Sequence, residues 1–437
     1  MSNSRALRGQ ILHFLDDPAM HGEAAWQSLD DGILWIENGY IRTVGDAAGL
    51  LAQLPADLPL QHFPHHLIIP GFIDTHIHYP QTEMIAAYGK QLLSWLQTYT
   101  FPTEMQFGDP EYASQIARIF LKELLRNGTT TALVFATVHP ESVDAFFNEA
   151  QALGLRMIAG KVMMDRNAPP ELCDTAASSL SQSRDLIRRW HGVDRLQYAV
   201  TPRFAPTSSE QQLLSAGALL KEFDDLYLHT HLSENRDEMA WVATLFPEAK
   251  NYLDVYDRAG LLSRRSVFAH GIHLSAGECQ RLGESGAAVA HCPTSNLFLG
   301  SGLINLEQLR AHGVHIGLGT DVGGGTSFSM LKTMDEAYKI QQLRGATLEP
   351  FQALYHATLG GARALDLEGT VGNFLPGNEA DCIVLDLHAT PLLQFRSQYC
   401  PTLKERLFML NTLGDDRVIE CSYAMGCCVH HRDGETR

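Results

Sequence analysis

The apolar residues of this chain fall into short continuous runs that alternate with longer segments of helical spacing. Eight of the runs have the length of a buried strand. They cover residues 67–73, 130–135, 156–163, 196–201, 226–231, 266–270, 287–291 and 315–320. Between runs, apolar residues recur every three or four positions, as at Ile116, Phe120 and Leu124. This spacing is typical of a helix with one buried face, so the pattern predicts an α/β fold of parallel strands connected by helices.

Eight strand–helix units favour a closed (β/α)8 TIM barrel over an open sheet. The two ends of the chain have a different pattern. Residues 32–41 are typical of two short strands around an Asn38-Gly39 turn, and a strand at residues 381–386 follows the turn at Pro376-Gly377. Because chain ends often meet in space, we expect a small β-sandwich domain built from residues 1–66 and 371–437, with the barrel at residues 67–370.

Composition narrows the classes of partner. The chain has 437 residues, 45% of them hydrophobic, which suits one barrel and a smaller companion. Its 33 Lys and Arg against 50 Asp and Glu give a net charge of −17. Such a surface repels phosphate groups, so we expect neither a nucleic acid polymer nor a membrane as partner.

The eight cysteines include no C-x-x-C spacing, which argues against a zinc ribbon. The start of the sequence shows no signal-peptide pattern, and we expect a cytoplasmic location.

A candidate metal site begins with two histidines that follow the first apolar run. His76 and His78 are two residues apart, so on a strand both side chains point to the same face. His231, His270 and Asp321 follow later strand runs in order, and the carboxyl ends of barrel strands carry catalytic residues. We expect His76, His78 and His231 to form a nitrogen-rich site suited to zinc or iron(II), with Asp321 as a fourth ligand.

Three of the candidate residues also have simpler interpretations. Glu234 is either a residue of a helix's first turn or a proton shuttle beside the metal. Asp321 precedes the Gly323-Gly324-Gly325 run, where a turn residue is common. His270 either packs in the core or contacts the reacting water or the substrate.

Three further side chains lie close to these runs. His229 is expected to share a face with His231 and to support a metal ligand. For His291 the default expectation is a structural role. Lys161 would suit a two-metal site if it were modified, but a single metal with Glu234 as shuttle accounts for the motifs better.

Several segments together resemble the amidohydrolase superfamily and, within it, the guanine deaminase family. The segments are residues 74–81, 95–102, 201–204, 229–235, 319–325 and 376–381. The resemblance extends over nearly the whole chain, with no departure at the motif positions. It implies one zinc ion per subunit, with iron as the alternative, bound by His76, His78, His231 and Asp321. It also implies a homodimer.

The same resemblance implies roles around a purine base. Gln81 and Arg203 would bind its polar edges and Phe204 would lie beside the ring, although by sequence alone Arg203 equally suits a surface ion pair. The ligands His78, His231 and Asp321, together with Glu234, would also contact the substrate.

The implied reaction is the hydrolysis of guanine to xanthine and ammonia in purine catabolism or salvage. Asp321 would take a proton from water, Glu234 would protonate N3 of the base and then the leaving amine, and His270 would hold the oxygen of the intermediate.

Other functions stay open at this point. A deaminase of 8-oxoguanine, of a thioadenosine nucleoside or of a triazine would share the metal motif, so only Gln81 and Arg203 discriminate among these substrates. The cytidine-deaminase class requires a P-C-x-x-C motif, which the sequence lacks. A non-catalytic barrel would be expected to lose ligands, and here all four are present.

Overall fold

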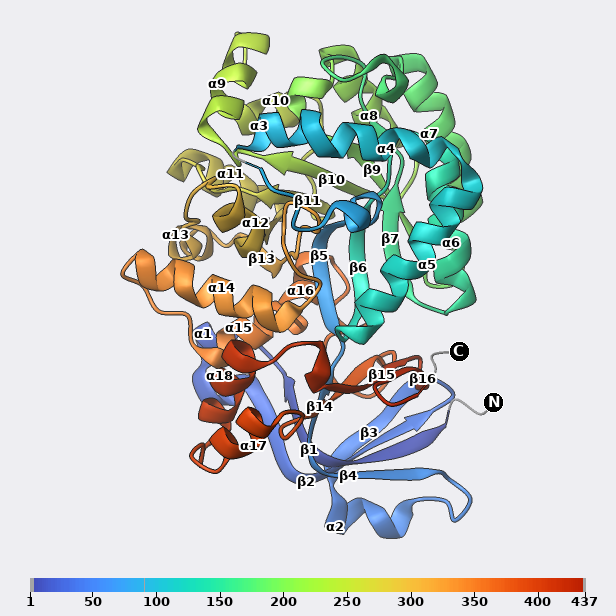
Figure 1. The fold of residues 1–437 in the computed structure, drawn as a ribbon, viewed down its shortest axis with the longest axis vertical. Coiled ribbons are helices and arrows are strands. Elements are labelled where there is room, and N and C mark those ends of the chain that lie inside the picture. Colours follow the sequence, from blue (N-terminus) through green and yellow to red (C-terminus); the bar gives the residue numbers. More distant parts are fainter. Residues whose placement is uncertain (1–3, 90, 435–437) are drawn as a thin grey trace.

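The computed structural model describes residues 4–89 and 91–434, and its central feature is a barrel of parallel strands (Figure 1). The strands are ordered β5-β6-β7-β9-β10-β11-β12-β13, and the short β8 pairs with β9. Their bounds are β5 (Phe72–His78), β6 (Thr129–Phe135), β7 (Arg156–Gly160), β8 (Val162–Met163), β9 (Gln197–Pro202), β10 (Tyr227–Leu232), β11 (Ser266–His270), β12 (Ala288–His291) and β13 (His315–Leu318). The predicted α/β barrel is confirmed.

Helices surround the barrel. Their bounds are α5 (Pro110–Arg126), α6 (Pro140–Ala152), α7 (Ala176–Trp190), α8 (Glu210–Glu222), α9 (Arg236–Leu245), α10 (Tyr252–Arg258), α11 (Ala276–Ser285), α12 (Pro293–Phe298), α13 (Leu306–Ala311), α14 (Met330–Leu343), α15 (Pro350–His356) and α16 (Leu359–Ala364). Helix α5 shows why they form: Asp109 caps its first turn, and the apolar face with Ile116, Phe120 and Leu124 is buried. Within the described residues, no helix is long and apolar enough to cross a membrane.

The barrel closes between its first and last strands through side chains and through two backbone hydrogen bonds just beyond β13, at 2.9 Å each. Among the described residues, no backbone ladder joins β13 to β5. Instead, the Thr75 hydroxyl donates to the Leu318 carbonyl at 2.9 Å, and the Thr320 amide donates to the Asp74 carboxylate at 3.1 Å. A Cβ at Gly317 would lie 2.3 Å from the Thr75 methyl group, so only glycine permits this close approach. The carboxyl ends of β5 and β13 are therefore held together.

The two ends of the chain form a separate seven-stranded sheet, as expected, with the order β16-β15-β14-β4-β1-β2-β3 (Figure 1). Its strands are β1 (Arg5–Phe14), β2 (Trp26–Glu37), β3 (Tyr40–Asp46), β4 (Leu60–Pro70), β14 (Cys382–Asp386), β15 (Ile419–Ala424) and β16 (Cys427–His431). The same terminal segments also contain four helices: α1 (Pro18–His21), α2 (Ala47–Leu50), α17 (Pro391–Ser397) and α18 (Leu403–Leu413). Asn38 and Gly39 adopt φ values of 54° and 86°, which confirms the predicted turn.

The prediction of a single strand over residues 67–73 is wrong. The run divides at Gly71: Leu67–Pro70 ends β4 of the terminal sheet, where Ile68 pairs with Val384 of β14, and Phe72 begins β5 of the barrel. Both parts are buried, so hydrophobicity alone does not show that they belong to different sheets. The run over residues 156–163 likewise divides, into β7 and β8. The domain limits at residues 66 and 370 stay predictions.

A buried ion-pair network joins the start of the barrel strands to the terminal sheet. Arg195, just before β9, donates to Glu379 and Asp381 at 2.6 Å each, and Arg156, which begins β7, donates from Nε to Glu379 at 2.8 Å. Their side chains are at most 10% exposed. The network therefore connects the sheet to the barrel end opposite the strand ends that carry His78 and His270.

We expect Glu379→Gln to lower the thermal unfolding midpoint, because two buried guanidinium groups then lose the carboxylate that they share. Removing one partner of a buried ion pair costs about 3–5 kcal/mol. The control is Glu149→Gln, which removes an exposed pair with Arg118 and is expected to cost less than about 1 kcal/mol. Equal midpoints for the two variants, measured by calorimetry, would contradict this role of Glu379.

Candidate active site

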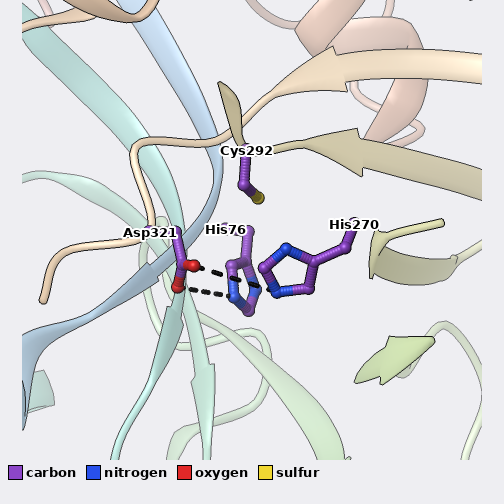
Figure 2. Close-up of side chains that lie close together, drawn as sticks. All are labelled: His76, His270, Cys292 and Asp321. Atoms are coloured by element: carbon purple, nitrogen blue, oxygen red, sulfur yellow. Dashed lines mark ion pairs between the residues drawn. The ribbon is translucent and has the colours of Figure 1, made fainter. Parts of the chain in front are cut away.

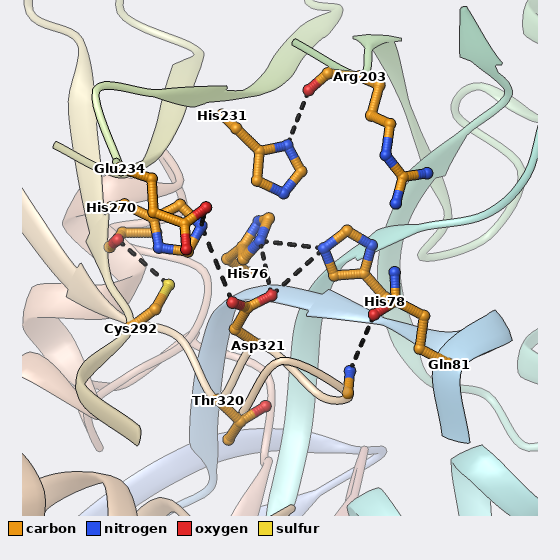
Figure 3. A network of polar contacts seen from close by, with 12 residues as sticks. His76, His78, Gln81, Arg203, His231, Glu234, His270, Cys292, Thr320 and Asp321 are labelled. Carbon is orange, nitrogen blue, oxygen red and sulfur yellow. Dashed lines mark hydrogen bonds and ion pairs between the residues drawn. The ribbon is translucent and has the colours of Figure 1, made fainter. Parts of the chain in front are cut away.

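The structure brings the predicted ligands together at the carboxyl ends of the barrel strands (Figure 3). His76 and His78 lie at the end of β5, His231 is the penultimate residue of β10, His270 ends β11, and Asp321 follows β13 by three residues. All five side chains are buried or nearly so. Strands at opposite ends of the sequence thus contribute to one site.

The donor atoms of four residues converge on one point. Nε2 of His76 lies 3.1 Å and Nε2 of His78 lies 3.3 Å from the same Asp321 oxygen, Oδ1. The two nitrogens are 3.2 Å apart. With His231 included, all four ligand atoms lie within 4.8 Å of one another.

Hydrogen bonds and burial prepare these groups for a cation. Nδ1 of His231 donates to the Arg203 carbonyl at 2.7 Å, which leaves the Nε2 lone pair of His231 free. Nδ1 of His76 contacts His229 at 2.7 Å, a contact of the kind that orients a metal ligand. Burial lowers the pKa of His76 and brings that of His78 to about 3, and both rings are therefore neutral at physiological pH.

Asp321 supplies the negative charge. Burial raises the pKa of its carboxyl, but the facing His76 and His78 rings outweigh this effect and hold the pKa well below its usual range. Neutral imidazoles around one carboxylate are the donor set that zinc and iron(II) prefer. The alternative interpretation of Asp321 as a simple turn residue does not account for these contacts.

A second, overlapping group consists of His76, His270, Cys292 and Asp321 (Figure 2). It suits a metal less well, because a cysteine binds metal as its thiolate. Burial raises the pKa of the Cys292 thiol well above its usual range, and the thiol donates to the Ala290 carbonyl at 3.4 Å. The histidine-rich group is the better metal site.

His270 is oriented toward the reaction space rather than into the core. Its Nδ1 lies 3.0 Å from Oδ1 of Asn296. Because an amide oxygen only accepts, this nitrogen carries the proton. Its Nε2 lies 3.4 Å from Oε2 of Glu234 and 3.8 Å from Oδ2 of Asp321. His270 therefore directs one ring nitrogen at both candidate catalytic carboxyl groups.

The carboxyl group of Glu234 is buried beside His270. Helix α9 is capped by Asn235, with Glu238 completing the capping box, so Glu234 is not the cap. Its Oε1 accepts from the Ser301 hydroxyl at 3.0 Å. Burial, and then the charge of Asp321, raise the pKa of Glu234 to about 8. The carboxyl group is therefore protonated at neutral pH and can donate.

The backbone at three strand ends is strained. Ser233, His270 and Asp321 have φ values of 49°, 72° and 53°, each in the left-handed region that costs of order 1–3 kcal/mol at a residue other than glycine. Hydrogen bonds hold this geometry: the Asp321 amide donates to the His76 carbonyl at 2.9 Å, and Gly271 donates to Leu232 at 2.9 Å. Two of these three residues, His270 and Asp321, line the cavity.

Three of the four candidate ligands, His78, His231 and Asp321, line one wall of a small cavity. The predicted substrate residues Gln81, Arg203 and Phe204 line it together with Glu234 and His270. Apolar side chains complete the lining: Leu92, Trp95, Leu96 and Leu299. The first three belong to α3 (Leu92–Trp95) and η4 (Leu96–Thr100), which lie across the barrel end in Figure 1.

Sequence reasoning missed Glu104, the last residue of α4 (Phe101–Glu104). Its two oxygens accept from Gln81 Nε2 at 3.1 Å and from Arg203 Nη1 at 2.7 Å. Arg203 is therefore in a buried ion pair, not a surface one. Asp74 was also missed: its Oδ1 accepts from the His76 amide at 3.1 Å. Asp74 belongs to residues 74–81, one of the segments that resemble the family. Glu104 lies just after another such segment, residues 95–102, and belongs to no motif.

Two other predicted candidates lie outside the ligand groups. Lys161 forms an ion pair with Asp174 and donates to the Val162 carbonyl at 3.2 Å. His291 is buried, its pKa is lowered to about 3 by burial, and neither ring nitrogen has a hydrogen-bond partner within the described chain.

The fold and this site define the class of barrel hydrolases that use a bound metal. The model of the amidohydrolase family matches residues 67–426. The guanine deaminase of Escherichia coli (strain K12) is 51% identical over 98% of both chains, and a solved structure of E. coli guanine deaminase gives a TM-score of 0.96, covering 98% of this chain and 100% of that one. The chain belongs to the amidohydrolase family.

Two further relatives agree with this assignment. A probable guanine deaminase of Deinococcus radiodurans is 43% identical over 98% of this chain and 99% of its own. The structure of guanine deaminase from C. acetobutylicum with bound guanine is 30% identical, with a TM-score of 0.88 over 97% of this chain and 99% of that one.

We expect His229→Leu to weaken zinc affinity about 10–100-fold, because loss of a group that orients a metal ligand has effects of this size. Zinc affinity is measured by competition with a chromogenic chelator. The matched control is His291→Leu, which removes a buried histidine without a hydrogen-bond partner and should keep the metal. A His229→Leu protein with the affinity of the unmodified chain would contradict the orienting role.

Proposed function

We propose that this chain catalyses the hydrolysis of guanine to xanthine and ammonia. The observation that carries the proposal is the meeting of three groups in one cavity: the His76–His78–His231–Asp321 cluster, the protonated Glu234, and the paired Gln81 and Arg203. The relatives at 51% and 43% identity over nearly the full chain, guanine deaminase and probable guanine deaminase, support guanine as the substrate.

In this proposal His76, His78, His231 and Asp321 would hold one divalent cation per subunit. The donor set suits zinc or iron(II), and the family resemblance favours zinc. When bound, the cation supplies Lewis-acid activation of water.

The remaining chemistry falls to three side chains. Oδ1 of Asp321 faces the two β5 histidines, whereas Oδ2 faces His270, so Oδ2 is placed to accept a proton from the attacking water. The oxygen adds to C2 of the base while Glu234 gives its proton to N3. Nε2 of His270 faces the same space, and this side chain would hold the oxygen of the intermediate.

The intermediate then loses its amine. The C2–N bond breaks as Glu234, recharged by the proton that Asp321 took from water, delivers that proton to the departing amino group. The hydroxyl group left on C2 becomes the carbonyl of xanthine as its proton passes to Glu234, which returns to its starting state. The balance is guanine plus water to xanthine plus ammonia. General acid–base transfer of this kind contributes about 10²–10⁴-fold in rate.

On the opposite side of the cavity, Gln81 and Arg203 would bind the polar edge of the base. Phe204 would lie beside the ring, and the apolar side chains Leu92, Trp95 and Leu96 would exclude water.

The same cluster would serve a deaminase of 8-oxoguanine, of a thioadenosine nucleoside or of a triazine. The high-identity relatives do not favour those substrates. A non-catalytic barrel is also disfavoured, because the ligand set and the proton carrier converge.

We further propose a cytoplasmic homodimer acting in purine catabolism or salvage. The family resemblance supports this proposal, and the net charge of −17 is consistent with a small-molecule substrate rather than a nucleic acid polymer.

Replacing Glu234 by Gln is expected to lower kcat for guanine by about 10²–10⁴-fold, because the amide cannot carry the proton. Ammonia release is measured alongside metal content, which should stay at one ion per chain. Glu248→Gln makes the same change at an exposed position and should keep full activity. Undiminished kcat in Glu234→Gln would contradict the proton-carrier role.

Removal of the metal is expected to abolish guanine turnover, since Asp321 would then face a water molecule that no cation polarises. The protein is treated with a chelator, dialysed and assayed, and then titrated with zinc or with iron(II). Activity should return at one equivalent, and the two titrations show which metal the site prefers. Full turnover by metal-free protein would contradict the proposed role of the cluster.

A further inference from the structure

Glu104 links the two side chains that face the substrate side of the cavity. We propose that it is a positioning residue that sets selectivity for guanine by fixing which polar groups of Gln81 and Arg203 face the base. This inference rests on the proposed function, because it concerns recognition of the same substrate at the same site.

The carboxylate is wholly inside the protein. Glu104 is 0% exposed, Gln81 is 2% exposed and Arg203 is 3% exposed. One Glu104 oxygen accepts from each of these neighbours, at 3.1 Å from Gln81 and 2.7 Å from Arg203. Glu104 itself is not among the residues that line the cavity, so it acts on the base only through the two side chains that it holds.

Glu104 determines the orientation of the Gln81 amide. On one side, the Gly323 amide, which can only donate, contacts Gln81 Oε1 at 3.2 Å. On the other side, the Glu104 carboxylate, which only accepts when ionised, contacts Gln81 Nε2. A rotated amide would face an acceptor with its oxygen and a donor with its nitrogen. One N–H of Gln81 therefore stays available in a known direction.

Arg203 is fixed at two points. Its backbone carbonyl accepts from Nδ1 of the metal ligand His231 at 2.7 Å, and its guanidinium pairs with Glu104. A guanidinium has five N–H donors, and this ion pair leaves others to face the cavity. Glu104 also balances the arginine charge, which would otherwise be buried without a partner at a cost in stability.

The result is a cavity wall that offers oriented donors. Guanine has an acceptor oxygen on C6, on the far side of N1 from the reacting C2. The base 2-aminopurine has the same reacting centre but lacks that oxygen, so it would leave the donors unpaired. Sites built to hydrogen-bond a substrate group discriminate strongly against an analogue without it. We therefore assign this discrimination to the Glu104 contacts.

The test compares zinc-loaded wild type, Glu104→Gln and the control Glu379→Gln, which weakens a buried ion-pair network far from the cavity. Each protein is assayed for kcat and KM with guanine, for competitive inhibition by 2-aminopurine, and for zinc content. In Glu104→Gln we expect KM for guanine to rise about 10–100-fold, with kcat and the inhibition constant of 2-aminopurine changing less than about threefold. Glu379→Gln should show none of these effects.

A double variant separates positioning from general damage. If Glu104 acts through Arg203, the effects of Glu104→Gln and Arg203→Gln on KM should not add, and the double variant should be no worse than the poorer single variant. The double variant leaves no unpaired charge buried at this position. It can therefore replace Glu104→Gln in the comparison if that single variant does not fold.

Four results would overturn the inference. They are an unchanged KM in Glu104→Gln, additive effects in the double variant, an equal loss of affinity for guanine and for 2-aminopurine, and a loss of zinc. In each case wild-type turnover of guanine leaves the proposed function intact. A zinc-loaded wild type that is silent on guanine would instead overturn the proposed function, and this inference with it.

Discussion

The contact between Asp321 and the two histidines of β5 is the interaction on which the rest of the site depends. It lies where the first and last barrel strands meet, and that seam is closed by hydrogen bonds of the Thr75 and Asp74 side chains and by the backbone bond from the Asp321 amide to the His76 carbonyl. The same seam presents three donor atoms, 3.1–3.3 Å apart, to a cation. Barrel closure and metal binding would therefore be coupled, because the candidate ligands come from distant parts of the chain.

Around this seam, different local environments give the carboxyl groups of Asp321 and Glu234 different pKa values. Asp321 stays ionised because it faces two imidazoles, whereas burial and the Asp321 charge raise the pKa of Glu234 to about 8. Carboxyl groups with pKa values pushed apart in this way are suited to opposite tasks in proton transfer. Glu104 has a third environment: it is paired with an arginine and holds the cavity wall. The three carboxyl groups thus differ in environment because of what each one touches.

Much of this architecture could be predicted from the sequence, because its signals are local. The spacing of His76 and His78, the apolar runs and the placement of His231, His270 and Asp321 after strand runs predict the barrel and the ligand set. The contacts made across the chain left no such signal. Glu104 meets Arg203 across 99 residues, and Asn296 meets His270 only once β11 and β12 are side by side. Substrate roles for Gln81 and Arg203 came from family resemblance, since residue type alone does not separate a binding arginine from an ion-paired one.

The most direct test of the account is ammonia release by the zinc-loaded wild-type protein from a panel of guanine, adenine, cytosine, 8-oxoguanine, a thioadenosine nucleoside and a triazine. The account predicts that guanine has by far the highest kcat/KM of the panel. A protein with one zinc per chain that is silent on guanine and active on another member would contradict the substrate assignment, although the barrel and its metal cluster would stand.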